Sequence, residues 1–351
     1  MMLQEAIKKL VEFQDLTEEE ARGAMREIMT GSATPAQIAS FLTALRMKGE
    51  KVEEIFALAQ TMREFSLKVR PRVGGRLVDT CGTGGDKIKT FNISTCSMFV
   101  AAGSGVKIAK HGNRSVTSKA GSADVLEFLG ARIDLGPEGV ERCIEEVGVG
   151  FMFAPVFHPS MKHALGPRRE IGVRTVFNIL GPLTNPAGAK GQLLGVYHPS
   201  LTEIIAGVLR KLGVERAMVV HGLDGLDELS TLGKSKVSEL RSGELKTYEI
   251  SPEQFNLPRA RAEDLLGAGV EENAKILLQI LKGHKGPKRD IVLLNSAAAI
   301  WAGALVDDLG EGIELAAESI DSGSAYRKLV DFIACTGGDL QKLRALEYGL
   351  S

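Results

Sequence analysis

The sequence has few aromatic residues, no excess of either charge and no long apolar run. Aromatic residues make up 5% of the 351 positions, which disfavours the base-stacking platforms of proteins that bind single-stranded nucleic acid. Lys and Arg total 43 and Asp and Glu total 44, so the chain lacks the basic excess of a non-specific nucleic-acid coat. No run of about 18 apolar residues occurs, and we therefore expect no membrane-spanning helix.

Cysteine is also scarce, and its four positions are scattered. Cys81, Cys96, Cys143 and Cys335 form no C-x-x-C pair, so neither a zinc site nor a redox dithiol is indicated. Scattered cysteines in a chain of this length are typical of reduced thiols, and the N-terminus has no signal-peptide core. We therefore expect a cytoplasmic protein.

Glycine is the residue in excess. It occupies 40 positions, while proline, at 12, is not raised with it, so the excess does not indicate a linker. In a packed enzyme such glycines mark tight turns and places where the backbone approaches a ligand.

The chain divides into a helical part and a part in which strands alternate with helices. Thr17 and Thr34 begin helices, the first by a capping box with Glu20 and the second with Pro at the first helical position, and the texture changes at residues 70–75. This predicts a helical domain at 1–70, completed by helices near 160–185, and an α/β domain at 71–351. The expected strands are 77–79, 106–109, 131–134, 150–153, 193–197 and 217–220, with a hairpin at 234–250, helices at 123–129 and 201–212, and further helices from about 271.

The strongest chemical segment follows the first of these strands. It contains Gly82-Thr83-Gly84-Gly85 and leads into a helix that begins near Asn92. Backbone N–H groups of such a turn, together with a helix N-terminus, form a cradle for phosphate or pyrophosphate. A tight strand-to-helix turn with an N-cap would have the same pattern. The segment is neither a G-x-G-x-x-G nor a Walker A motif.

A second loop, at 110–122, interleaves cations with glycines and hydroxyl groups. Its cations are Lys110, Arg114 and Lys119, which suit a ligand rich in charged oxygens. The alternative is a solvated basic loop, and His111 alone could be an ordinary turn residue.

Three further features are weaker. Asp227 and Glu228 are adjacent carboxylates on a loop, which suits Mg²⁺, although most such pairs are simply solvated. Arg168 or Arg169 could grip a carboxylate, or could form a surface ion pair. The Gly-Pro step at 181–182 and the Asn-Pro step at 185–186 are interpreted as turns rather than chemistry.

Taken together, five segments resemble the anthranilate phosphoribosyltransferase family. They are Gly-Thr-Gly-Gly-Asp at 82–86, Asn-Ile-Ser-Thr at 92–95, Lys-His-Gly-Asn-Arg at 110–114, Asn-Ile-Leu-Gly-Pro-Leu-Thr-Asn-Pro at 178–186 and Asp-Glu at 227–228. The resemblance runs in order from the N-terminal helices to about residue 235, and the C-terminal third carries no usable motif.

The resemblance implies a fold and a reaction. The fold would be of the nucleoside phosphorylase and phosphoribosyltransferase type, with a small helical domain and a larger α/β domain built on a mixed sheet. The reaction would transfer phosphoribosyl from 5-phosphoribosyl 1-pyrophosphate (PRPP) to the amino group of anthranilate. It gives N-(5-phosphoribosyl)anthranilate and pyrophosphate in tryptophan biosynthesis. The resemblance also implies Mg²⁺ and a homodimer formed through the helical domain, with no nucleic-acid or membrane partner.

It further implies a role for each matched position. PRPP would contact Gly82, Gly85, Asp86, Thr90, Asn92, Ile93, Ser94, Thr95, Lys110, His111, Gly112, Asn113, Arg114, Ser115, Val116, Thr117, Ser118 and Ser122. Anthranilate would contact Gly82, His111, Asn113 and Arg168, with Arg168 on its carboxylate. Magnesium would be held by Ser94, Asp227 and Glu228, directly or through water. Lys110 would stabilise the departing pyrophosphate, and no covalent or general-base residue is expected.

Two alternatives remain at this point. A pyrimidine nucleoside phosphorylase of the same fold would bind phosphate and a nucleoside. A non-catalytic relative would bind nucleic acid, which the balanced charge and the intact Asp227-Glu228 pair disfavour.

Overall fold

The N-terminal helices pack on one another as their apolar spacing predicts. The computed structural model describes residues 2–115 and 120–349. Its first helices are α1 (Met2–Val11), α2 (Glu18–Thr30), α3 (Pro35–Lys48) and α4 (Val52–Glu64). The Thr17 and Thr34 hydroxyls accept the backbone N–H groups of Glu20 and Gln37, so both expected helix starts are confirmed. Gly49, at φ +88°, ends α3.

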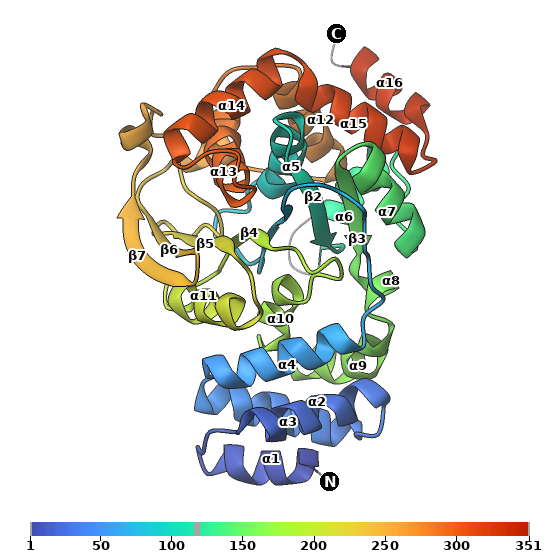
Figure 1. Cartoon of the computed structure of the whole chain (residues 1–351), viewed down its shortest axis with the longest axis vertical. Helices are drawn as coiled ribbons and strands as arrows, with labels where there is room; N and C mark the ends of the chain where they lie inside the picture. The colour runs from blue at the N-terminus through green and yellow to red at the C-terminus, as the bar shows by residue number, and fades with distance from the viewer. Residues whose placement is uncertain (1, 116–119, 350–351) are drawn as a thin grey trace.

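A later segment of the chain lies against these helices. It comprises α8 (Ala154–Phe157), a 3₁₀ turn (Pro159–Met161), α9 (Lys162–Ile171) and α10 (Phe177–Leu183). Helix α9 packs against α2 and α3, and α10 packs against α4 (Figure 1). The expected turn at the Gly-Pro step 181–182 is wrong, because both residues lie inside α10.

In the described part of the chain, seven strands form one mixed sheet in the order β3-β2-β1-β4-β5-β6-β7. The strands are β1 (Leu77–Gly82), β2 (Lys107–Gly112), β3 (Val149–Phe153), β4 (Gly191–Gly195), β5 (Arg216–Gly222), β6 (Ser235–Arg241) and β7 (Glu244–Ile250). Strands β1 to β5 are parallel, and β6 and β7 are antiparallel to their neighbours. The predicted hairpin is confirmed, and Ser242 and Gly243, at φ +52° and +83°, make its two-residue turn.

The strand order creates a switch point beside β1. From β1 the chain proceeds to β2 and β3 on one side, and it later returns to β4 and β5 on the other. In parallel α/β sheets the crevice beyond the carboxyl ends of two such strands is the usual ligand site. We call the corresponding position in this chain, beyond Gly82 and Gly195, the crevice.

Both faces of the sheet are covered, which explains the apolar strands. Along β5, Met218 and Val220 pack into one core, whereas Ala217 and Val219 pack into the other. The first core contains α5 (Ile93–Gly103) and the C-terminal helices, and the second contains α11 (Leu201–Lys211), α10 and the N-terminal helices (Figure 1).

The remaining elements complete the α/β part. They are α6 (Ser122–Phe128), α7 (Pro137–Glu146), α12 (Val270–Leu281), α13 (Pro287–Ala302), α14 (Leu309–Asp321), α15 (Ser324–Cys335) and α16 (Leu340–Tyr348), with 3₁₀ turns at Pro252–Phe255 and Ala262–Leu265. Within residues 2–115 and 120–349 we find no helix with the length and hydropathy needed to span a bilayer.

One predicted strand is wrong. Residues 131–134 form no strand, although their burial alternates, with Ala131 and Ile133 buried. The Arg132 N–H donates to the Thr336 hydroxyl (3.1 Å) instead of to a neighbouring strand. The alternation therefore reflects packing against the C-terminal helices rather than a sheet.

Candidate active site

The turn after β1 is built so that its backbone reaches both β4 and the acidic loop. Gly84 and Gly85 have φ of +70° and +90°, which side chains other than glycine rarely adopt. The Thr83 N–H donates to the Gly195 carbonyl (2.9 Å), and the Gly84 N–H donates to Oδ2 of Asp227 (2.8 Å). A Cβ atom on Gly82 would lie 2.5 Å from that same oxygen. The glycine turn at 82–85 and the acidic pair at 227–228 are therefore in contact.

The chain then folds back through Asp86 to the N-terminus of α5. Oδ2 of Asp86 accepts both the backbone N–H (2.8 Å) and the hydroxyl (2.9 Å) of Thr90. Asn92 precedes α5, but its side chain does not cap the helix: its amide donates to the Ala120 carbonyl (3.1 Å) and its oxygen accepts from Asn273 (3.0 Å). Asn92 thus ties the start of α5 to the second loop.

Lys110 is buried at the end of β2 and points toward the start of α5. Its ammonium donates to the Thr80 carbonyl and to the Ser94 hydroxyl (3.2 Å). Burial lowers the pKa of Lys110, and the charges of Asp79 and Glu228 oppose that shift. A desolvated cation therefore lies beside Ser94.

Asp79, on β1, is near Lys110 on the neighbouring strand β2 and is completely buried. Its carboxylate accepts the His111 N–H (3.1 Å) and the Asn185 amide (2.8 Å). Burial raises the pKa of Asp79 to about 6, against the opposing effects of Lys110, Asn185 and the His111 N–H. The carboxylate therefore holds the last turn of β2 in place.

The acidic pair is desolvated rather than solvated. Burial, and then the charge of Asp86, raises the pKa of Asp227 to about 6. Burial and the charge of Asp227 raise the pKa of Glu228 well above its usual range, while Lys110 opposes this. The next residue, Leu229, is held by both ends of the Asn295 amide, at 3.0 and 2.9 Å.

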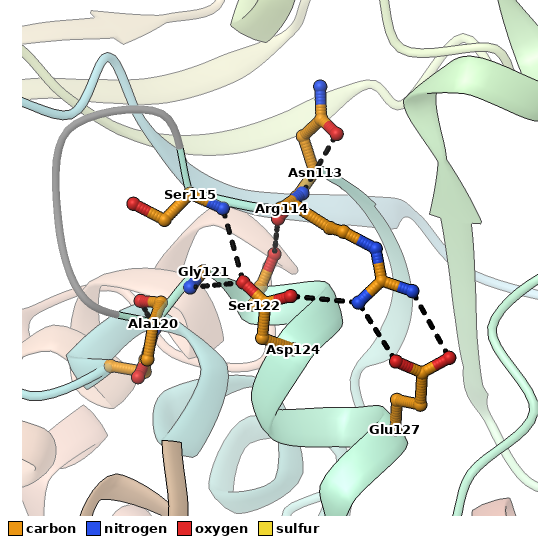
Figure 2. A network of polar contacts seen from close by, with 9 residues as sticks. Asn113, Arg114, Ser115, Ala120, Gly121, Ser122, Asp124 and Glu127 are labelled. Atoms are coloured by element: carbon orange, nitrogen blue, oxygen red, sulfur yellow. Dashed lines mark hydrogen bonds and ion pairs between the residues drawn. The ribbon is translucent and has the colours of Figure 1, made fainter. Parts of the chain in front are cut away.

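Figure 2 shows how the described part of the second loop is anchored. Asp124, on α6, accepts the N–H groups of Ser115 (3.2 Å) and Gly121 (2.9 Å), and the Ser122 hydroxyl donates to the Asn113 carbonyl (3.3 Å). The Arg114 guanidinium pairs with Asp124 and Glu127, both at 2.8 Å, so its charge is directed at α6. The candidate residues Val116, Thr117 and Ser118 lie outside the described residues, as does Lys119.

Two histidine rings lie between the helical part and the sheet. The rings of His111 and His158 are 5.0 Å apart, and Nδ1 of His111 bonds the Gly181 carbonyl (3.1 Å). Among the described residues, neither Nε2 atom has a hydrogen-bond partner, although both are buried. Burial lowers the pKa of His111 to about 4 and that of His158 to about 3, so both rings are neutral at pH 7.

The structure distinguishes the two candidate arginines on α9. Arg169 is exposed, whereas Arg168 is half-buried and stacks on Phe177, with 5.1 Å between guanidinium and ring centre. Burial lowers the pKa of Arg168, and none of the ion pairs in the described part of the chain involves it. It is therefore a desolvated cation without a carboxylate partner there.

Sequence reasoning missed several residues that shape this site. Asn185, interpreted as a turn residue, is buried and donates to both Asp79 and the Ala109 carbonyl (2.8 Å). Arg174 lies over the Tyr197 ring (4.5 Å) and donates to the Gly85 carbonyl (3.5 Å). Asn295, on α13, holds the acidic loop in place, although the sequence of that helix contains no motif that indicates a function. Nothing local in the sequence gives the partners of these side chains.

Comparison with known proteins agrees with this architecture. Residues 74–326 match the glycosyl transferase family α/β domain, and residues 4–66 match the helical bundle domain of that family. An anthranilate phosphoribosyltransferase of Acetivibrio thermocellus is 59% identical over 335 residues, covering 95% of this chain and 97% of that protein.

Solved structures give the same result. The anthranilate phosphoribosyltransferase of Thermus thermophilus superimposes with a TM-score of 0.90 at 46% identity, covering 95% of this chain and 99% of the other. The Saccharomyces cerevisiae enzyme, solved in complex with PRPP and Mg, superimposes with a TM-score of 0.87 at 31% identity, covering 95% of this chain and 98% of the other. That enzyme has also been solved in complex with 4-fluoroanthranilate. These relatives favour phosphoribosyl transfer over the nucleoside phosphorylase and nucleic-acid-binding alternatives. The chain belongs to the anthranilate phosphoribosyltransferase family.

Proposed function

We propose that this chain transfers phosphoribosyl from PRPP to anthranilate in the crevice beyond β1 and β4. The observation that carries the proposal is the contact between the glycine turn and Asp227, with buried Lys110 close by. Backbone donors, a desolvated cation and two desolvated carboxylates meet at one switch point, which suits a diphosphate and its divalent cation.

We propose that PRPP binds between the glycine turn, the N-terminus of α5 and the end of β2. Backbone N–H groups in the 82–95 segment donate hydrogen bonds to phosphate oxygens, without interference from side chains at Gly82, Gly84 and Gly85. The hydroxyl groups of Ser94, Thr95 and Ser115, with the other family-matched positions, add donors around the sugar and its phosphates, whereas the Thr90 hydroxyl donates to Asp86 and can only accept. Arg114 remains a family-matched position, although its guanidinium pairs with α6 and its backbone N–H donates to the Asn113 side chain (2.8 Å).

Asp227, Glu228 and Ser94 are proposed to hold Mg²⁺. The donor set fits, because hard oxygens suit this cation and because burial and a neighbouring carboxylate, Asp86 for Asp227 and Asp227 for Glu228, raise the pKa of both groups. No group of three His, Cys, Asp or Glu side chains suited to a metal occurs within 2–115 and 120–349, which agrees with a cation that also relies on PRPP oxygens and water. When bound, Mg²⁺ supplies positive charge to the pyrophosphate.

Anthranilate is placed between the histidine rings and Arg168. Arg168 is desolvated and takes the carboxylate in a paired hydrogen bond. Neutral His111 can bond or pack against the aromatic ring through its free Nε2, and Asn113 and Gly82 line the side that faces the sugar. Because an aryl amine is neutral at pH 7, no general base is needed before it attacks.

The chain's own residues then act by charge and position. Lys110 is fixed by Thr80 and Ser94, so it can stabilise the developing charge of the departing pyrophosphate without reorganising. Arg168 and His111 keep the amine near the anomeric carbon, and closure of the helical part over the crevice excludes water.

The direct test is anthranilate fluorescence. We expect the emission of anthranilate to fall with time only when enzyme, PRPP and Mg²⁺ are all present. An unchanged signal, with phosphate-dependent cleavage of thymidine instead, would contradict the proposal and favour the nucleoside phosphorylase.

We further propose a cytoplasmic homodimer that joins through the helical domain at 1–70, completed by the helices near 160–185. All four cysteines are free thiols, which supports the reducing compartment. Val11, Phe13 and Met47 are 56%, 66% and 69% exposed, which supports an apolar interface there. Sedimentation of Phe13→Asp with Met47→Glu should give a monomer where the unmodified chain gives a dimer.

A further inference from the structure

The segment that joins α4 to β1 borders a small cavity. The segment is held against the rest of the chain by the Leu67 N–H on the Phe157 carbonyl (3.0 Å) and the Val69 N–H on the Pro186 carbonyl (3.3 Å). Beside it lies a cavity of about 210 Å³, here called the linker pocket. It is lined by Arg63, Lys68, Val69, Arg70 and residues 185–188.

Three cations and no carboxylate line the linker pocket. Arg63 donates through Nε to the Leu183 carbonyl (2.7 Å), which leaves the outer nitrogens of its guanidinium for another acceptor. Burial lowers the pKa of Arg63 to about 10. Burial, and then the charges of Arg63 and Arg70, lowers the pKa of Lys68. Both arginines therefore repel Lys68, while the charge of Glu64 opposes the shift of Lys68 and that of Asp79 opposes the shift of Arg63.

The nearest described carboxylates are engaged elsewhere. Glu64 pairs with Arg26 (2.8 Å) and Arg22 (3.6 Å) on α2. Glu141, on α7, accepts the backbone N–H of Arg70 (2.6 Å). Asp79 is held by Asn185 and His111. In the part of the chain that the structure describes, no ion pair neutralises any of the three pocket cations.

We propose that the linker pocket binds a phosphate dianion, either as free inorganic phosphate or as the phosphoryl group of a phosphomonoester. A planar carboxylate is satisfied by one guanidinium fork, whereas three cations in one pocket match a tetrahedral dianion. The volume favours a single phosphate group, because pockets that enclose drug-sized ligands measure about 300–1,000 Å³. The bound anion would join the interdomain segment to the 185–188 turn, which carries Asn185.

The test compares phosphate binding by three proteins, using isothermal titration calorimetry in 150 mM NaCl. They are the unmodified chain, the double variant Lys68→Gln with Arg70→Gln, and the control Arg72→Gln. Arg72 is exposed on the same segment but does not line the pocket. Arg63 is left unchanged because it bonds Leu183 across the interdomain segment, whereas the Lys68 ammonium donates to its own segment, to the Arg63 carbonyl and the Ser66 hydroxyl (3.1 Å). The substrate crevice, which is proposed to bind phosphate groups as well, is the same in all three proteins, so phosphate bound there contributes the same component to each titration. The component that differs between the proteins reports on the linker pocket, and no turnover is required.

We expect the double variant to bind inorganic phosphate at least tenfold more weakly than the unmodified chain, and Arg72→Gln to bind it as the unmodified chain does. A parallel titration with glycerol 3-phosphate identifies the source, because the tighter of the two ligands is the form that the pocket prefers. Equal phosphate affinity in all three proteins, equal weakening by both variants, or no binding of either ligand by the unmodified chain would each overturn the proposal.

Discussion

Replacing Asn185 with Ala should destabilise the protein, and the loss should grow as pH rises. The Asn185 amide donates to two acceptors that water cannot reach: the carboxylate of Asp79, which is 0% exposed, and the Ala109 carbonyl, both at 2.8 Å. Only the ionised form of Asp79 needs that donor to stabilise its negative charge. The destabilisation caused by Asn185→Ala should therefore increase as pH rises above about 6, the folded pKa of Asp79.

The magnitude follows from the two lost hydrogen bonds. A bond to a charged group contributes about 1.5–3 kcal/mol, and a buried carbonyl left without a donor costs about 1–3 kcal/mol, so we expect a loss of about 4 kcal/mol. With about 2.1 cal/mol/K of unfolding entropy per residue, 351 residues give about 0.74 kcal/mol/K, and the loss corresponds to about 5 °C in Tm.

The sign of the pH dependence is fixed by the same contacts. The bond from Asn185 lowers the folded pKa of Asp79, so removing it raises that pKa further above the unfolded value. The folded variant then holds its proton to higher pH than the unfolded chain, and stability falls as pH rises through that range. The deficit of the variant should therefore be larger at pH 8 than at pH 5.

The assay is thermal unfolding at pH 5 and pH 8, with Asn178→Ala as the matched control. Asn178 lies on the same segment, and among residues 2–115 and 120–349 its side chain accepts the Thr175 N–H (2.9 Å) alone, so its loss should be smaller and equal at both pH values. A deficit for Asn185→Ala that matches the control, or that shrinks toward pH 8, would refute the role assigned to the Asp79 contact.

Three further outcomes follow from the site. Asp227→Asn with Glu228→Gln should raise the Mg²⁺ concentration for half-maximal activity at least tenfold, and an unchanged Mg²⁺ titration would remove both carboxylates from the metal site. Arg168→Ala should raise the KM for anthranilate about 10–100-fold, the effect of losing a charged hydrogen bond, with little change for PRPP; Arg169→Ala should change neither. The folded pKa of His158, about 3, lies below the unfolded value of 6.5, so the protein loses stability as pH falls below 6.5. His158→Asn should therefore reduce the decline in Tm between pH 6.5 and pH 5. An equally steep decline in the variant would show that His158 is not its cause.

Local patterns predict the parts of the fold that depend on near neighbours in sequence. The helix starts at Thr17 and Thr34 need a partner only three residues away, and the turn at Gly82–Gly85 needs only glycine's conformational freedom. The hairpin around Ser242 is equally local. For this reason the amino-acid sequence is sufficient to predict these features.

Features that depend on distant partners cannot be predicted in this way. The alternation at 131–134 is consistent with a strand, but Arg132 bonds Thr336, 204 positions later. The composition of the second loop predicts that Arg114 faces a ligand, yet its charge is taken by Asp124 and Glu127 on the next helix. Asn185 gives only a turn signal, because the sequence does not reveal that an amide just beyond the end of α10 lies beneath β1 and β2.

The charges of the crevice are held apart, and this arrangement is what suits it to catalysis. Lys110 affects the ionisation of Asp79 and Glu228, but in the described part of the chain it forms no direct ion pair with either. Its ammonium instead donates to the Thr80 carbonyl and the Ser94 hydroxyl, and these hydrogen bonds fix its position. Because the cation and the acidic pair do not neutralise each other, both remain available to the diphosphate and counter-ion that we propose to bind there. The energy needed to keep them desolvated is supplied by the two cores on either side of the sheet, before any substrate binds.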